Sequence, residues 1–262
     1  MQTRQFDRRQ FTLKLADNDA EIRASQRLRY RVFVEELGAS VDPESARLGV
    51  ERDAFDPFFD HLLLIDNCHD DPDDRIVGSY RLLRGEVAAK GPGYYSSSEF
   101  DLSPIVASGR RAVELGRSCV DARYRGSIAM LLLWNGVAEY VLERDIEILF
   151  GVASFPGTDP APFAPALSYL FYNHLAPEDI RVRVLKDERA IPLNVLPRAS
   201  VHEEDAMVGI PPLIKGYLRL GGVIGDGACI DAGFNTIDVC LIVDTNRMSE
   251  KHKAFYVRGF ER

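Results

Sequence analysis

The order of hydrophobic and polar residues predicts that strands and helices alternate along this chain. Residues 10–16 alternate apolar and polar side chains, which is the two-residue period of a half-buried strand. Asn18 then offers a helix N-cap, and Glu21, three residues later, completes the pattern of a capping box. We expect this helix to run to about residue 37 and an acidic loop to follow over residues 38–60.

The rest of the chain continues the alternation. Strands are predicted over residues 61–66, 75–83, 111–120, 146–154, 180–185 and 237–243, and helices over residues 128–143 and 166–174. The first two of these strands flank a turn-rich stretch, as in an antiparallel hairpin. The glycine-rich residues 221–227 are interpreted as a turn, and the last third is expected to be irregular up to residue 237. This order is typical of a mixed α/β sandwich, not of a parallel doubly wound sheet.

Length and composition predict one large domain. With 262 residues, 46% of them hydrophobic, the chain can bury a full core. We expect a core fold over residues 10–185 and a C-terminal extension over residues 186–262 that packs on it. No run of about 18 uncharged apolar residues is present, and the first ten residues are charged, so we expect a cytoplasmic protein with at most peripheral membrane contact.

Charge and metal-binding residue types exclude several classes of function. A formal net charge of -8 disfavours nucleic acid as a partner and weakly favours a cationic small substrate. The four cysteines show no Cys-x-x-Cys pairing, so we expect them to be reduced and mostly buried. No two of the five histidines have metal-ligand spacing, and we predict no metal site.

A charged residue lies within the apolar face of the first predicted helix. On a helical projection Arg29 falls among Leu28, Val32 and Phe33. Its guanidinium group must either extend to the edge of this face or meet a buried carboxylate, because an unpaired buried charge costs several kcal/mol. The sequence leaves both arrangements open.

Further charges lie in or beside the predicted central strands. Arg81 interrupts one apolar strand, and Glu114 and Arg117 lie in another, where they face opposite sides unless a bulge intervenes. Ion pairs on a solvated sheet face would explain any one of them. Together with the acidic loop residues, however, they form a set that is more typical of a functional site, and those loop residues are Glu51, Asp53 and Asp56.

These residues follow one another in an order that resembles a known family. Arg29-x-x-x-Phe33, Glu51-x-Asp53-x-x-Asp56, the strand around Arg81 and Glu114-Leu115-Gly116-Arg117 resemble the acyl-homoserine lactone synthases, a branch of the GNAT superfold, over residues 10–155. A second resemblance spans nearly the whole chain. The stretches 153–159, 211–221 and 234–239 are similar to those of the ornithine lipid N-acyltransferases. It implies a GNAT-type α/β fold with a central, mostly antiparallel mixed sheet flanked by helices.

The second resemblance also implies an activity. It is transfer of a 3-hydroxyacyl chain to the α-amine of ornithine. Glutamine or another amino acid remains an alternative substrate. An acyl-homoserine lactone synthase and a non-catalytic protein that binds acyl carrier protein remain alternative functions.

The resemblance assigns roles residue by residue. Arg29 and Phe33 match the helix that shapes the amino acid and acyl end of the site. Asp53 and Asp56 match the loop that contacts the amine substrate and holds that helix. The charged network of the central strands is matched by Arg81, Glu114 and Arg117.

The turn after the second of these strands is a candidate phosphate site. Ordinary GNAT enzymes hold coenzyme A pyrophosphate with Gln/Arg-x-x-Gly-x-Gly/Ala, whereas Arg123-Tyr124-Arg125-Gly126-Ser127-Ile128 ends in isoleucine. Main-chain N–H groups at a helix N-terminus beside Arg123 and Arg125 still suit a phosphopantetheine phosphate. The altered last position favours acyl carrier protein as the donor, and a solvated basic turn is the alternative.

The expected chemistry is direct attack by the amine on the thioester, without a cofactor or a metal. Glu51 and Glu114 are the candidates for the proton path, and Arg117 completes the predicted catalytic set. Residues Ser118, Cys119 and Val120 form the expected oxyanion-donor region. Cys119 has no recognisable histidine partner, so we do not expect a thioester-forming nucleophile.

Overall fold

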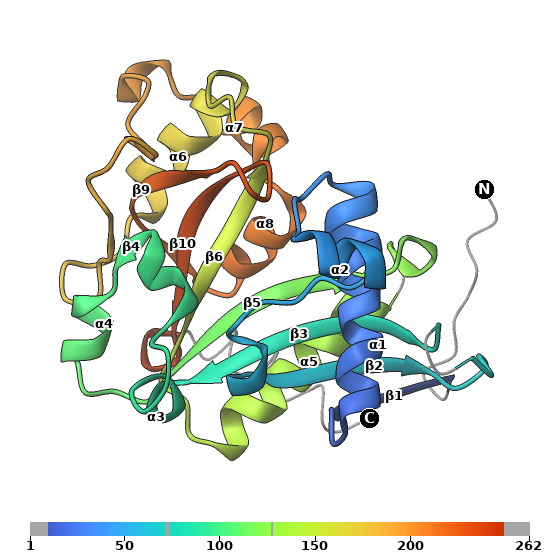
Figure 1. Ribbon diagram of the computed structural model, residues 1–262. Helices are drawn as coiled ribbons and strands as arrows, with labels where there is room; N and C mark the ends of the chain where they lie inside the picture. Colours follow the sequence, from blue (N-terminus) through green and yellow to red (C-terminus); the bar gives the residue numbers. More distant parts are fainter. Residues whose placement is uncertain (1–9, 72–73, 127, 249–262) are drawn as a thin grey trace. The chain divides into compact units, whose positions relative to one another are not determined.

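The computed structural model describes residues 10–71, 74–126 and 128–248, which form two compact units (Figure 1). The first unit holds residues 10–92 and 115–145, and the second holds residues 93–114 and 146–248. These boundaries differ from the expected division at residue 185. The C-terminal residues supply strands to the second unit's sheet.

The sheet of the first unit is antiparallel over its first three strands, and its strand order is β1-β2-β3-β5. The strands are β1 (Phe11–Leu15), β2 (Asp60–Asp66), β3 (Ile76–Arg84) and the part of β5 (Ala112–Val120) from residue 115 onward. In the β2–β3 hairpin, His61 lies directly opposite Arg81. The predicted hairpin is therefore confirmed.

Helices α1 (Asp19–Arg29), α3 (Gly85–Ala88) and α5 (Ala129–Glu143) of the first unit contact strands of this sheet. The other helical segments are a π-helical continuation of α1 (Tyr30–Glu36) and α2 (Pro43–Leu48), with 3-10 turns at Asp56–Phe58 and Ala122–Tyr124. Asn18 caps α1 by accepting a hydrogen bond from the Glu21 main-chain nitrogen, as predicted. The Glu21 carboxylate bonds the main-chain nitrogen of Asp17 instead of Asn18, so the capping box is shifted by one residue.

The acidic loop contains a short helix that was not predicted from the sequence. Asp42 caps α2 by accepting hydrogen bonds from two main-chain N–H groups, and Pro43 occupies its first position. Gly49 ends it with a positive φ of 63°. These are standard start and stop signals, but the helix has only six residues and therefore too little apolar periodicity to be recognised.

The sheet of the second unit has the strand order β5-β6-β10-β9-β7-β4, with β8 paired to β9. Its strands are β4 (Phe100–Asp101), the start of β5, β6 (Ile148–Pro156), β7 (Arg183–Val184), β8 (Ala190–Ile191), β9 (Val223–Asp231) and β10 (Thr236–Asp244). The pair β5–β6 is parallel, and β6–β10–β9 are antiparallel. The mixed α/β sheet predicted from the sequence is confirmed. The strand expected over residues 180–185 is reduced to the two residues of β7.

Helices of the second unit lie around its sheet, and α7 packs on α6. They are α4 (Ser103–Ala107), α6 (Ala164–His174), α7 (Glu203–Gly209) and α8 (Pro212–Arg219), with 3-10 turns at Tyr95–Ser98, Ala161–Phe163, Arg198–Ser200 and Thr245–Arg247. Buried residues such as Phe100, Phe150, Val182 and Ile242 form the core.

The expectation of an irregular last third is wrong. Two helices and strand β9 occupy it, and most of the glycine-rich residues 221–227 lie in β9, not in a turn. A Cβ atom on Gly225 would lie 2.6 Å from Val182, and one on Gly227 would lie 2.3 Å from Val184. Glycine is therefore required by the close approach of β7, and these glycines hide the alternation that predicts a strand.

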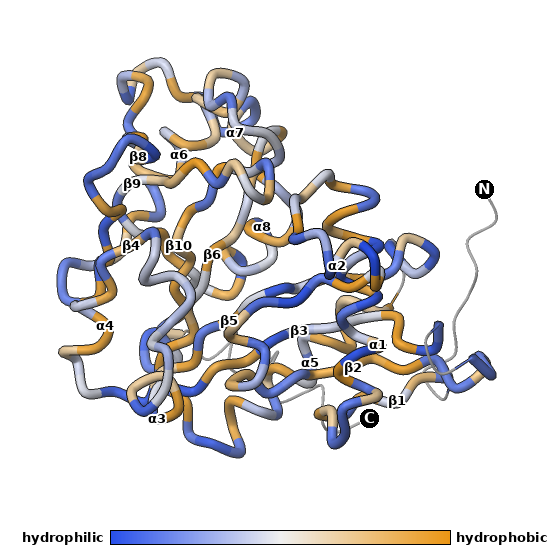
Figure 2. Tube along the Cα trace, viewed as in Figure 1, coloured by the Kyte–Doolittle hydropathy of each residue, from blue (hydrophilic) through white to orange (hydrophobic). Residues whose placement is uncertain are grey.

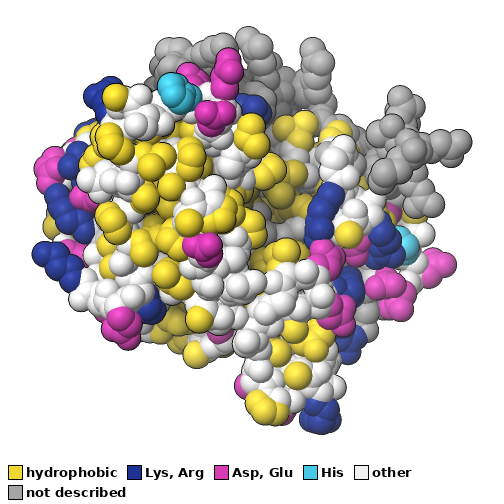
Figure 3. All heavy atoms as spheres, turned by 90° about the horizontal axis from the view of Figure 1, so that it is seen from above, with side chains coloured by type: hydrophobic (Ala, Val, Ile, Leu, Met, Phe, Trp, Pro, Cys, Tyr) yellow, Lys and Arg dark blue, Asp and Glu magenta, His cyan; other side chains and the backbone are white. Residues whose placement is uncertain are grey.

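Hydrophobic residues are concentrated in strands such as β2 and β10, whereas the connecting loops are mostly hydrophilic (Figure 2). Hydrophobic side chains also gather at the surface of the second unit around α6 and α7 (Figure 3). Val208 of α7 is 86% exposed. Within residues 10–71, 74–126 and 128–248, every helix is too short or too polar to cross a bilayer.

Candidate active site

Three arginines and three carboxylates of the first unit form a closed ring of alternating charges. Each neighbouring pair is joined by an ion pair of 2.6–3.2 Å. In order around the ring, the residues are Arg29, Glu51, Arg117, Asp53, Arg81 and Asp56. We call this set the charge ring. It joins α1, the acidic loop, β3 and β5, and its formal charges cancel.

Arg29, the last residue of α1, is fully buried. Its Nε donates to Glu51 Oε2 at 2.6 Å, and one terminal nitrogen donates to Asp56 Oδ2 at 2.6 Å. Of the two arrangements that the sequence left open, the structure therefore has the buried carboxylates. Such pairing offsets the high cost of moving a guanidinium group out of water.

Arg81 is also fully buried, so an ion pair on a solvated sheet face does not describe it. One terminal nitrogen donates to Asp53 Oδ1 at 2.8 Å and to Asp56 Oδ1 at 2.7 Å. Its guanidinium carbon lies 4.4 Å from the centre of the Phe59 ring, within the range of a cation–π contact. From this buried position Arg81 pairs with both aspartates.

Arg117 reaches the ring because the backbone of β5 departs from regular strand geometry. Its φ is +48°, in the left-handed region that non-glycine residues seldom adopt. From there Nε donates to Glu51 Oε1 at 3.0 Å, and a terminal nitrogen donates to Asp53 Oδ2 at 3.2 Å. The bulge considered from the sequence thus has a counterpart in a local distortion at this residue.

The arginines keep all three carboxylates of the charge ring ionised. Burial alone would raise the pKa of Glu51, but the guanidinium groups of Arg117, Arg29 and Arg81 together lower it. The pKa values of Asp53 and Asp56 are lowered in the same way. The Asp53 side chain is 20% exposed, compared with 3% for Glu51 and 6% for Asp56. Asp53 is therefore the ring carboxylate that an external ammonium can reach most easily.

Glu114 belongs to the second unit, where it anchors a turn. Its carboxylate accepts hydrogen bonds from the main-chain nitrogens of Tyr95 at 2.8 Å and Ser96 at 2.7 Å, and from the Ser96 hydroxyl group. The residue is 1% exposed. This geometry holds the 3-10 turn at Tyr95–Ser98 in place, a role that the sequence did not suggest.

The predicted acyl and oxyanion residues lie along the apolar side of the first unit. Phe33 packs against the core cluster that contains Leu28 and Cys119. Cys119 is buried, and burial raises the pKa of its thiol to about 12, which agrees with the expectation that it is not a nucleophile. Ser118 is half-buried, and Val120 is buried with its carbonyl oxygen accepting a hydrogen bond from Arg125.

The candidate phosphate turn precedes α5. The Arg123 guanidinium group makes two 2.9 Å hydrogen bonds to Asp121, and that of Arg125 makes a 2.6 Å ion pair with Glu36. Both side chains are 46% exposed. Gly126 has a φ of +72°, and Ser127 lies outside the described residues. The turn thus presents two fixed but accessible cations.

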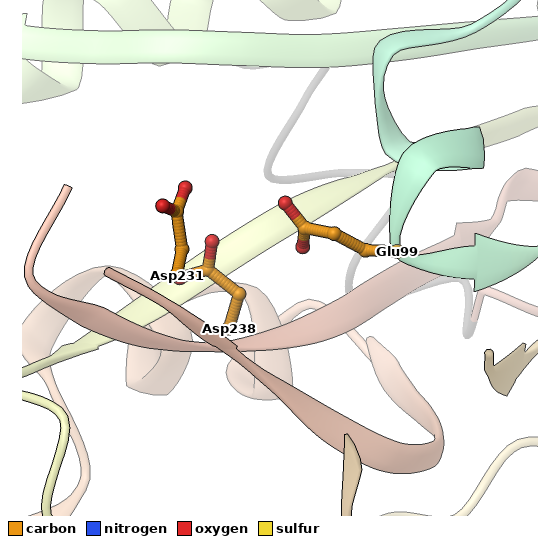
Figure 4. A group of neighbouring side chains, drawn as sticks. All are labelled: Glu99, Asp231 and Asp238. Atoms are coloured by element: carbon orange, nitrogen blue, oxygen red, sulfur yellow. The ribbon is translucent and has the colours of Figure 1, made fainter. Parts of the chain in front are cut away.

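Three carboxylates of the second unit lie close together, and the sequence did not indicate them. Glu99, before β4, lies beside Asp231 of β9 and Asp238 of β10 (Figure 4), and oxygen atoms of the three lie within 4.8 Å of one another. Carboxylate oxygens suit hard cations such as Mg²⁺ or Ca²⁺. Glu99 is far from the two aspartates in sequence, which is why no spacing motif predicted the group. We assign no ion to it.

Comparison with known proteins shows which family the chain belongs to. Residues 28–135 match the family model described as an acetyltransferase (GNAT) domain. The chain is 50% identical over 255 residues to the L-ornithine N(alpha)-acyltransferase of Rhodobacter capsulatus, covering 96% of both chains. This chain belongs to the L-ornithine N(alpha)-acyltransferase family. It is 41% identical to the Rhizobium meliloti member, with 93% of this chain and 83% of that protein covered.

Solved structures of other proteins resemble this acyltransferase family member in fold. FeeM, an N-acyl amino acid synthase from uncultured soil microbes, aligns with a TM-score of 0.52 and 11% identity, over 93% of this chain and 97% of the other. The acyl-homoserine lactone (AHL) synthase LasI aligns with a TM-score of 0.50 and 16% identity, over 92% and 93%. Both predicted resemblances, and the GNAT-type fold, are therefore confirmed.

Proposed function

We propose that this acyltransferase moves a 3-hydroxyacyl chain from acyl carrier protein to the α-amine of ornithine, which gives lyso-ornithine lipid. The observation that carries the proposal is the 41–50% identity, over 93–96% of the chain, to proteins named L-ornithine N(alpha)-acyltransferase. The geometry of the charge ring and of the phosphate turn supplies the parts that such a reaction needs.

On the amine side, we assign Asp53 and Asp56 to the ornithine site. Ornithine carries two ammonium groups, and charge-assisted hydrogen bonds to carboxylates are about twice as strong as neutral ones. The partial exposure of Asp53 supports direct contact, whereas the burial of Asp56 supports a role through Arg29 and Arg81. Arg29 in turn fixes the helical segment that carries Phe33.

On the donor side, we assign the phosphopantetheine phosphate to Arg123, Arg125 and Gly126, with Ser127 as a further candidate. The exposure of both guanidinium groups supports contact with a phosphate and with the acidic surface of a carrier protein. In the second unit, Arg111 is exposed, whereas Arg110 is held by Asp244 at 2.5 Å. Its exposure makes Arg111 a second candidate contact for the carrier protein.

The proposed chemistry needs no cofactor beyond the donor thioester. The amine nitrogen attacks the thioester carbonyl carbon, the new C–N bond forms, and the C–S bond breaks. The ammonium proton leaves through a protein carboxylate or a water, and the pantetheine sulfur departs as the thiol. Main-chain N–H groups near Ser118, Cys119 and Val120 are our candidates to stabilise the oxyanion.

Two carboxylates are candidates to accept the ammonium proton. The lowered pKa of Glu51 makes it a poor proton acceptor, because its two arginine partners stabilise the ionised form. Glu114 accepts three hydrogen bonds, from the main-chain nitrogens of Tyr95 and Ser96 and from the Ser96 hydroxyl group. We propose that Glu114 receives the proton through a water, and that Glu51 with Arg117 positions the amine.

Incubation of the purified protein with single donors and single amines tests this function. The donors are 3-hydroxyacyl carrier protein and the matching acyl-coenzyme A, and the amines are ornithine and glutamine. We expect an acylated ornithine, formed faster from the carrier protein. A faster reaction with glutamine would correct the amine, a faster reaction with coenzyme A would correct the donor, and binding of the carrier protein without product would favour the non-catalytic alternative.

A further inference from the structure

We propose that Tyr124 is a positioning residue for the acyl donor, whose buried hydroxyl group ties the phosphate turn to Asp66 at the end of β2. This inference rests on the proposed function, which assigns the donor phosphate to the turn. The sequence does not suggest the contact, because the two residues are 58 positions apart and nothing in the motif of the turn points to Asp66.

The turn presents its arginines outward and its tyrosine inward. Tyr124 is 4% exposed, whereas the Arg123 and Arg125 side chains on either side of it are each 46% exposed. The Tyr124 hydroxyl group donates to Asp66 Oδ2 at 2.5 Å. Its ring packs edge-on against Phe11 of β1, with 6.0 Å between ring centres. The inward side chain thus fixes the segment from which the two cations project.

Asp66 is a buried hydrogen-bond acceptor with further partners. It is 1% exposed, and its carboxylate also accepts hydrogen bonds from Gln10 Nε2 at 2.7 Å and from the Cys68 main-chain nitrogen at 2.9 Å. Burial would raise its pKa, but the hydrogen bonds from Tyr124, Cys68 and Gln10 lower it. The acceptor is therefore ionised, and its bond to the tyrosine is charge-assisted.

His69 completes the anchor. Its Nε2 lies 3.0 Å from the Tyr124 hydroxyl oxygen. A phenol has one proton, and Tyr124 gives that proton to Asp66, so the histidine must be the donor in this contact. The phosphate turn consequently contacts three other places in the first unit. These are the start of β1, the end of β2 and the turn that follows β2.

The expected benefit of this anchor is preorganisation of the donor site. A turn that is already shaped binds its ligand without the cost of ordering flexible groups. Without the anchor, the incoming phosphopantetheine must order the turn itself, so affinity for the donor falls. The ornithine site relies on the charge ring, whose ion pairs involve neither Tyr124 nor Asp66. Loss of the anchor should therefore weaken binding of the acyl donor and leave binding of ornithine unchanged.

A second tyrosine–aspartate pair, at the other end of β2, provides a matched control. Tyr140 of α5 is 3% exposed, and its hydroxyl group donates to Asp60 Oδ2 at 2.5 Å. Asp60 is the first residue of β2, and Asp66 is the last. The replacements Tyr140→Phe and Tyr124→Phe thus each remove a tyrosine–aspartate hydrogen bond, at opposite ends of one strand. The Tyr140 bond is part-buried, the Tyr124 bond is buried, and only Tyr124→Phe also removes the His69 contact and concerns the phosphate turn.

The experiment measures KM for 3-hydroxyacyl carrier protein, KM for ornithine and the melting temperature of both variants. We expect Tyr124→Phe to raise the donor KM about tenfold, equivalent to about 1.4 kcal/mol, while the ornithine KM stays within about twofold. Tyr140→Phe should lower the melting temperature similarly and leave both KM values unchanged. An unchanged donor KM in Tyr124→Phe, or an equal rise in Tyr140→Phe, would overturn the assignment.

Direct binding separates this inference from the proposed function. Calorimetry with holo-acyl carrier protein, without ornithine, should show weaker binding to Tyr124→Phe than to wild type, even if ornithine proves not to be the amine. If wild type binds no carrier protein, the inference fails as well. If Tyr124→Phe does not fold, His69→Ala replaces it, since that side chain is 36% exposed. The donor KM should then rise about threefold, and no change would overturn the inference.

Discussion

Arg29 donates to Glu51 twice, once to its carboxylate and once to its main-chain oxygen, and each hydrogen bond is 2.6 Å long. The two residues are 22 positions apart and fully or almost fully buried. The end of α1 and the start of the acidic loop are thereby fixed to each other in both side chain and backbone. Both residues also pair with other members of the charge ring, Arg29 with Asp56 and Glu51 with Arg117.

Arg29→Met should strongly destabilise the protein, because Glu51 and Asp56 would each lose a buried counter-charge. We expect a loss of about 3 to 5 kcal/mol in the free energy of unfolding, measured by chemical denaturation. The control is Arg23→Met on the same helix, outside the charge ring, which should change stability by less than about 0.5 kcal/mol. Equal effects of both replacements would show that the buried pairing is not what stabilises α1.

Acid should weaken the charge ring in a defined range of pH. The pKa values of Glu51, Asp53 and Asp56 lie below their ordinary values of 4.5, 3.8 and 3.8. A carboxylate with a lowered pKa in the folded state stabilises fully above its unfolded pKa, and this stabilisation is lost as the pH falls through the folded pKa. The free energy of unfolding should therefore hold near neutral pH and fall below about pH 4.5. Asp56→Asn should fall less steeply, and an unchanged slope would contradict the assignment.

Asp53→Asn and Asp56→Asn should separate substrate contact from positioning. Asparagine keeps the size of the side chain and removes its charge. Asp53→Asn should raise KM for ornithine about tenfold and KM for the acyl donor little, since Asp53 is the more accessible carboxylate. Asp56→Asn should mainly lower the melting temperature, because its charge is shared between two buried arginines. Wild-type KM values for ornithine in both variants would remove the acidic loop from the substrate site.

Glu114→Gln tests the proton path. If Glu114 accepts the ammonium proton, this variant should lower kcat at neutral pH by about 10² to 10⁴-fold and remove the acidic limb of the kcat/KM pH profile. If it only anchors the turn at Tyr95–Ser98, the pH profile should keep its shape. Ser96→Ala is the control, since it removes one hydrogen bond to the carboxylate but leaves the carboxylate itself.

The features that follow from local pattern could be predicted from the sequence. The Asn18 cap, the β2–β3 hairpin and the charge of Arg29 within an apolar helix face are each indicated by a short stretch of sequence. Helix α2 was missed although its signals are local, since six residues show too little periodicity. Strand β9 was missed because glycines demanded by the neighbouring strand interrupt its alternation.

The closure of the charge ring could not be predicted from the residues alone. Its members come from α1, the acidic loop, β3 and β5, and the last contact needs the unusual backbone of Arg117. The pairing of Tyr124 with Asp66 has the same character, because it depends on tertiary packing across 58 residues. The resemblance to a known family indicates the candidate residues, but only the structure shows which side chains each of them pairs with.

Acylation of the α-amine of ornithine can be tested in one competition experiment. The purified protein is given 3-hydroxyacyl carrier protein and an equimolar mixture of ornithine and the standard amino acids, and the product is fragmented in a mass spectrometer. We expect one dominant product in which the acyl group is on the α-nitrogen of ornithine. A dominant product with another amino acid, or with the acyl group on the side-chain nitrogen of ornithine, would contradict it.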